Sequence, residues 1–141
     1  MAEECKKHSK LALRVLEDTL LNDVVEPLLK RLAAQSGLSN IRELLEHYEK
    51  NPGELSVEKL LVALNRGGKH RFVLMAISPL IGWVKRRGGV NYEEAVEFAK
   101  ECGLEKTYKL LVAYPNIGSK LVELLNALAG VEKVGSARES E

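Results

Sequence analysis

Residues 66–87, RGGKHRFVLMAISPLIGWVKRR, combine the densest positive charge of the chain with its longest uncharged run. Basic residues lie at both ends of the segment, and no acidic residue lies within it. The uncharged run, residues 72–84, contains Pro79, Gly82 and the only tryptophan, Trp83. A membrane-spanning helix needs about 20 apolar residues, so this shorter run predicts buried core helices and no contact with a membrane.

Pro79 predicts that the segment folds as two helices. Proline lacks the N–H group that a helix interior needs, and its ring clashes with the preceding turn. Ser78 is a favourable N-cap for a helix that has Pro79 in its first position. We therefore expect one helix over residues 69–77 and another over residues 79–87, with the glycines of residues 88–89 ending the second.

The remainder of the chain also predicts helices. Leucine, alanine, glutamate and lysine are abundant and aromatic residues make up 5% of the chain, a composition typical of helical globules. Apolar residues recur at helical spacing, and glycine or proline separates the segments. The sequence therefore predicts an all-α protein, a compact bundle of about seven to eight short helices, with no strand.

Capping residues predict several helix boundaries. Asp23 and Glu26, three residues apart, predict a break after a first helix and a capping box for the second. Asn91 and Glu94 predict another capping box. Ser119 is expected to cap the last helix, which would run to about residue 129.

The chain is long enough for one domain, which we expect to cover residues 1–130, with a flexible tail over residues 131–141. Residues 40–46 align with residues 91–97, and KLLVALNRGGK (59–69) aligns with KLLVAYPNIGSK (109–120). A duplication would give similar three-helix units behind an N-terminal helix pair, but capped, leucine-rich helices also look alike by composition alone. The units would be about 39–88 and 90–130, and the sub-units of the domain would be 1–37, 38–89 and 90–130.

Cysteine usage and the N-terminus predict a cytoplasmic protein. Cys5 and Cys102 do not make a disulfide framework, and free thiols suit a reducing compartment. The N-terminus MAEECKKHSK has no apolar stretch behind a basic start, so it predicts no secretion signal. Glutamate and lysine dominate the charged residues while glutamine occurs once, a bias that favours a thermophilic source.

Signals for catalysis or metal binding are weak. Cys5 and His8 offer two ligands on one helix face, which is too few for a metal site. Glu93, Glu97 and Glu101 share a face at a spacing of four, which suits a hard cation or a solvated ridge. No phosphate-binding glycine loop or nucleophile elbow is present. We therefore expect no enzyme activity, no catalytic residue, no metal and no cofactor.

The basic segment is the candidate functional site. The formal net charge of +1 divides into about +6 within residues 66–87 and −5 elsewhere. Such a cluster can contact phosphates, dock on an acidic protein or only solvate the ends of two helices. Trp83 could stack on a base, although a lone tryptophan among aliphatic residues is more often a core residue. The predicted nucleic-acid-binding residues are Arg66, Lys69, His70, Arg71, Lys85, Arg86 and Arg87.

LLVALNRGGKHRF (60–72) followed by ISP (77–79) resembles the core of helix-turn-helix and winged-helix DNA-binding proteins. The resemblance covers about thirty residues and implies three short helices with the third one at the DNA. In this chain the third helix carries Leu80, Ile81, Trp83 and Val84 where a reading helix has polar side chains. The sequence therefore favours contact with phosphates over base reading.

Two functions follow as expectations. The first is a small helical protein that binds DNA or RNA through the phosphate backbone, without strong base specificity. The alternative is a non-catalytic interaction subunit that docks protein subunits or copies of itself through its basic and acidic faces. In size, helix content and charge, the chain is similar to the small all-helical subunits of CRISPR effector complexes.

Overall fold

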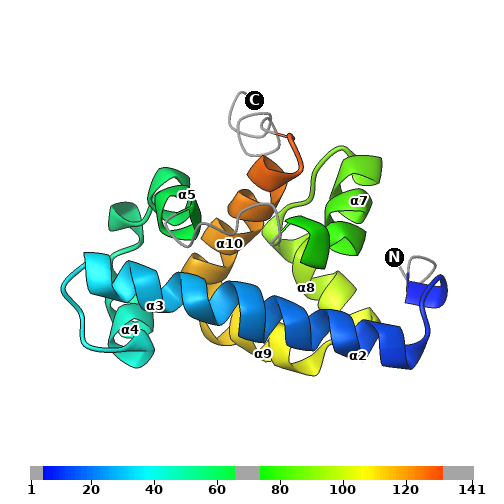
Figure 1. Ribbon diagram of the computed structural model, residues 1–141, viewed down its shortest axis with the longest axis horizontal. Coiled ribbons are helices and arrows are strands. Elements are labelled where there is room, and N and C mark those ends of the chain that lie inside the picture. The colour runs from blue at the N-terminus through cyan, green and yellow to red at the C-terminus, as the bar shows by residue number, and fades with distance from the viewer. Residues whose placement is uncertain (1–4, 66–73, 132–141) are drawn as a thin grey trace.

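The computed structural model describes residues 5–65 and 74–131, and every regular element in these ranges is a helix (Figure 1). This confirms the all-α prediction and the compact bundle of about eight short helices. The order is α2 (Lys10–Thr19), the π-helix η1 (Leu20–Val25), α3 (Glu26–Gln35), α4 (Ile41–Lys50), the short 3-10 helix η2 (Pro52–Glu54), α5 (Val57–Asn65), α7 (Ser78–Arg87), α8 (Tyr92–Glu101), α9 (Glu105–Ala113) and α10 (Pro115–Leu128).

Helix α10 lies at the centre of the bundle and packs against α4, α5, α7, α8 and α9 (Figure 1). The approach of α8 and α9 to α10 depends on Gly118. A Cβ atom at Gly118 would lie 3.0 Å from Cδ2 of Leu111 and 3.1 Å from Cε1 of Tyr92. The hydroxyl group of Tyr92 donates to the carbonyl oxygen of Leu111 at 2.7 Å, which links α8 to α9 at the same place.

The N-terminal helices α2, η1 and α3 follow one another without a break along one side of the molecule (Figure 1). The expected break at Asp23 and its capping box are therefore wrong. The N–H group of Glu26 donates to the carbonyl oxygen of Leu21, five residues back, which makes the turn before Pro27 wider than an α-helical turn. A π turn accommodates the proline because its ring then meets less crowding from the preceding turn.

The predicted cap at Asn91 agrees with the start of α8, whereas the predicted cap at Ser119 does not agree with the start of α10. Asn91 and Glu94 form the expected capping box of α8. Helix α10, however, begins at Pro115, and Ser119 lies inside it. The reason is a contact distant in sequence, because the carboxylate of Glu49 accepts from the N–H groups that a local cap would satisfy.

Of the two helices expected around Pro79, the structure confirms the second one, predicted over residues 79–87. Helix α7 runs over Ser78–Arg87 with Ile77 as its N-cap, so the boundary lies one residue earlier than expected. Residues 74–76 are helical, and the rest of the helix expected over 69–77 lies outside the described residues.

The packing of the helices differs between the two predicted units. Helices α8, α9 and α10 pack on one another, whereas α4 and α5 pack on α3 and α10. The internal duplication and the division into sub-units stay predictions. The tail beyond residue 131 lies outside the described residues.

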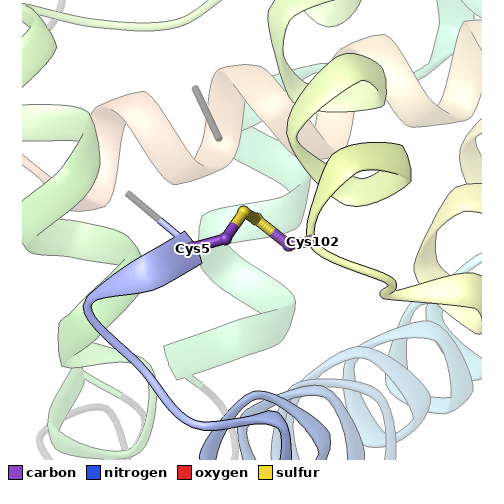
Figure 2. Close-up of a disulfide and its surroundings, with 2 residues drawn as sticks. All are labelled: Cys5 and Cys102. Carbon is purple, nitrogen blue, oxygen red and sulfur yellow. A yellow bond between two sulfur atoms is a disulfide. The ribbon is translucent and has the colours of Figure 1, made fainter. Parts of the chain in front are cut away.

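Cys5 and Cys102 form a disulfide, so the prediction of free thiols is wrong (Figure 2). Their Cα atoms are 5.3 Å apart, within the range that a disulfide bridges. The two residues are 97 positions apart in the sequence, and only the fold brings the N-terminal segment to the end of α8. The cysteines therefore no longer favour a reducing compartment. Among the helices of residues 5–65 and 74–131, none has the length and apolarity to cross a membrane.

Candidate nucleic-acid interface

Helix α7 is fixed to the core through one apolar face. Leu80, Ile81, Trp83 and Val84 are buried on this face. The indole ring of Trp83 stacks on the ring of Phe98, with centroids 4.1 Å apart and planes inclined by 24°. Trp83 is 3% exposed, which confirms the core interpretation and leaves no face on which a nucleic-acid base could stack.

The C-terminal end of α7 is held by a tight glycine cap. Gly88 adopts the left-handed conformation with φ 72°, which glycine reaches without the steric cost of a side chain. The N–H group of Gly89 then donates to the carbonyl oxygen of Val84 at 2.9 Å. The next residue, Val90, exchanges both backbone hydrogen bonds with the buried amide of Asn126 on α10, at 3.0 and 2.7 Å. The last turn of α7, called the basic turn here because it carries Lys85, Arg86 and Arg87, is therefore anchored to α10 through Val90.

Lys85, Arg86 and Arg87 are the exposed residues of this last turn. Consecutive helical residues point about 100° apart, so the three cations spread around the end of α7. The guanidinium of Arg86 lies beside Gly82, since a Cβ atom there would be 3.2 Å from Nη1 of Arg86. The turn offers charge to solvent in several directions rather than one flat patch.

Arg87 has a partner that the sequence did not suggest. Its guanidinium donates to Oε2 of Glu94. The other carboxylate oxygen, Oε1, accepts from the N–H group of Asn91 at 3.0 Å as part of the capping box of α8. Glu94 thereby joins the end of α7 to the start of α8, and its negative charge offsets part of the positive charge of the turn.

The structure locates three of the seven predicted site residues. Arg66, Lys69, His70 and Arg71 lie outside the described residues. The three located cations lie at the negative end of the dipole of α7, where cations are favoured. A phosphate group would therefore be bound there by the long side chains and not by backbone N–H groups, which point the other way along the helix.

Three acidic residues follow one another along α8 at a spacing of four. Glu93, Glu97 and Glu101 are exposed on α8, and no group of carboxylates, histidines or cysteines suited to a metal ion occurs in the two described ranges. Nζ of Lys106 on α9 lies 4.0 Å from Oδ1 of Asp18 on α2.

Comparison of the chain with protein-family models, with curated proteins and with solved structures gives no match. A functional assignment therefore rests on the chemistry of the residues themselves.

Proposed function

We propose that this protein binds nucleic acid through the phosphate backbone, by means of the basic segment 66–87 and with little base specificity. The observation that carries the proposal is the cluster of six Lys/Arg without an acidic residue in that segment. Lys85, Arg86 and Arg87, its located members, are exposed at the end of α7. Each lysine or arginine that contacts a phosphate releases condensed counterions, whatever the base sequence.

The side chains of α7 support backbone contact over base reading. A reading helix in the major groove presents several polar side chains along its length. Helix α7 exposes Ser78, Pro79 and, partly, Gly82 before its basic last turn. None of these three has a long polar side chain that could reach base edges, so the cations of the last turn are its means of contact.

The proposal places the protein in the cytoplasm, where nucleic acid is found. A disulfide such as Cys5–Cys102 occurs in intracellular proteins of hyperthermophiles, and as a redox-responsive bond in other cytosolic proteins. The excess of glutamate and lysine over glutamine also fits a thermophilic source.

The test is fluorescence anisotropy of labelled duplex DNA, single-stranded DNA and RNA with a charge-neutralised variant. Lys85→Gln/Arg86→Gln removes two cations from the basic turn. Lys100→Gln/Lys109→Gln is the matched control, because it removes two exposed cations from α8 and α9. We expect about a tenfold loss of affinity for the first variant, or about 1.4 kcal/mol, and less than a threefold loss for the control. Equal effects of both variants would contradict a specific role for the basic turn.

A second candidate function is that of a non-catalytic interaction subunit in a larger complex, such as a ribonucleoprotein. The exposed row Glu93, Glu97 and Glu101 on α8 favours it, because this acidic surface follows directly after the basic turn of α7. Surfaces of opposite charge allow copies or other subunits to dock head to tail. Light scattering at low and high salt tests it, and a monomer at every salt concentration with no captured partner contradicts it.

A further inference from the structure

The N-terminal arm is defined here as residues 5–19, and α2 forms most of it. Helix α2 buries only Leu13, Leu16 and Glu17. Leu11 and Val15, one helical turn apart, are 70% and 55% exposed. The extensive backbone contacts of α2 are with η1, the segment that continues it.

The arm is connected to one short stretch of chain, residues 102–107, by a disulfide, by hydrogen bonds and by an ion pair. The first is the disulfide from Cys5 to Cys102 at the end of α8 (Figure 2). The second is Glu17, whose Oε2 accepts from the backbone N–H and the hydroxyl of Thr107 at 2.8 and 2.9 Å. The third is the pair of Asp18 and Lys106, 4.0 Å apart.

These connections differ in strength. The pair of Asp18 and Lys106 is largely exposed, and such surface pairs add little to stability. Glu17 supplies a missing N-cap to α9, because Leu104, the residue at the cap position, makes no side-chain hydrogen bond. The disulfide is the connection that a reductant can break and an oxidant can restore.

An apolar cavity of about 110 Å³ lies next to η1, the segment that follows the arm. Leu20 and Leu21 of η1 line this cavity, together with Leu104 and Thr107. Between the arm and α3 lies the π-helix η1, a local irregularity of a kind that is frequent at functional sites in helices.

We propose that the Cys5–Cys102 disulfide is a redox-controlled latch, which fixes the N-terminal arm on the α8–α9 turn when oxidised and releases it when reduced. The reductant is a dithiol. One of its thiolates attacks Sγ of Cys5, the more exposed of the two cysteines, and Cys102 leaves as a thiolate that takes up a proton. The second thiol of the reductant then attacks the mixed disulfide and releases Cys5 as a thiol. The dithiol becomes a disulfide, and two electrons and two protons pass to the protein.

Hydrogen exchange followed by mass spectrometry tests the latch on the full chain. Oxidised protein is compared with protein reduced by dithiothreitol, at labelling times short enough for α3 and α10 to stay protected. We expect the amides of residues 13–19 to exchange at least tenfold faster after reduction, with α3 and α10 unchanged. Reoxidation with oxidised dithiothreitol should restore the protection. Cys5→Ser should show the fast exchange without reductant and no response to it.

Two results would overturn the latch. If residues 13–19 keep their protection in the reduced protein, the hydrogen bonds of Glu17 hold the arm without the disulfide. If α3 and α10 lose protection together with the arm at the same labelling times, the disulfide is a general cross-link of the fold and not a latch.

Discussion

Asn116 at the start of α10 and Glu49 at the end of α4 are joined by two hydrogen bonds. The backbone N–H of Asn116 donates to Oε2 of Glu49 at 3.1 Å, and its side-chain amide donates to the backbone oxygen of Glu49 at 3.0 Å. The other carboxylate oxygen accepts from the N–H of Ile117 at 3.2 Å. A carboxylate at a helix N-terminus satisfies free N–H groups and is favoured by the helix dipole. This contact fixes the helix on which five others pack.

Glu49→Ala should lower the free energy of unfolding by about 1–2 kcal/mol, because it leaves N–H groups of α10 without an acceptor. Urea denaturation followed by circular dichroism measures it. Glu46→Ala is the control, since Glu46 lies exposed on the same helix and makes only a long ion pair, with its Oε2 4.0 Å from Nε of Arg42. We expect this variant to lose less than about 0.5 kcal/mol of unfolding free energy. Similar losses for the two variants would show that Glu49 is not a cap.

Two glycines in helices should respond in opposite ways to alanine. Gly118→Ala should destabilise the protein by about 1–3 kcal/mol, because its Cβ would lie only 3.0 Å from Cδ2 of Leu111 and 3.1 Å from Cε1 of Tyr92. Gly82→Ala should stabilise it by about 0.5–1 kcal/mol, since alanine is the better helix former and only the flexible end of Arg86 must move. Denaturant midpoints compare the two, and a reversed order would contradict the packing at α10.

Tyr92 should make stability depend on pH in the alkaline range. Burial raises the pKa of its hydroxyl above the ordinary value of 10.0, and the charges of Glu49 and Glu93 raise it further, with Tyr108 adding to the effect. Since the folded-state pKa is the higher one, the contribution of neutral Tyr92 is complete below the unfolded-state pKa and is lost as pH rises through the folded-state pKa.

Wild-type protein should therefore lose stability above about pH 10 more steeply than Tyr92→Phe, which has no hydroxyl to ionise. Denaturation in urea at a series of pH values measures this difference. Parallel curves for the two proteins would contradict the assignment. At neutral pH, Tyr92→Phe should be less stable by about 0.5–1.5 kcal/mol, because it lacks the hydrogen bond to Leu111.

Glu94→Gln should strengthen nucleic-acid binding. Glutamine keeps an oxygen that can accept from the N–H of Asn91, as the capping box requires, and removes the negative charge beside Arg87. A gain of about two- to fivefold at low salt is expected, since an exposed charge pair is worth about 0.5–1 kcal/mol. Anisotropy measures it, and unchanged or weaker binding would argue against a role for Arg87.

Local sequence patterns were sufficient for the fold class and for many helix boundaries. The cap at Asn91 lies three residues from the N–H group of Glu94 that it binds, so residue type and spacing alone could reveal it. The end of α7 at Gly88 was likewise predictable, because glycine adopts the left-handed conformation of a helix C-cap without a steric cost.

The features that sequence patterns missed depend on residues far apart in the chain. Glu49 caps α10 across 67 positions, and Glu17 bonds Thr107 across 90. The disulfide spans 97. The pair of Arg87 and Glu94 is closer in sequence, but it requires the glycine turn that reverses the chain between them. No periodicity or capping rule contains such contacts, because they arise only when the helices pack.

The most direct test of phosphate binding is the salt dependence of the dissociation constant, measured by anisotropy for the wild-type chain on duplex DNA, single-stranded DNA and RNA. If the basic segment contacts four to six phosphates, the logarithm of the association constant, the reciprocal of the dissociation constant, should fall against the logarithm of the salt concentration with a slope of about −4 to −5 on duplex DNA, at about 0.9 per phosphate. Lys85→Gln/Arg86→Gln should reduce the magnitude of that slope by about 2. Absence of binding at low salt, or a slope that the double variant leaves unchanged, would contradict the proposed function.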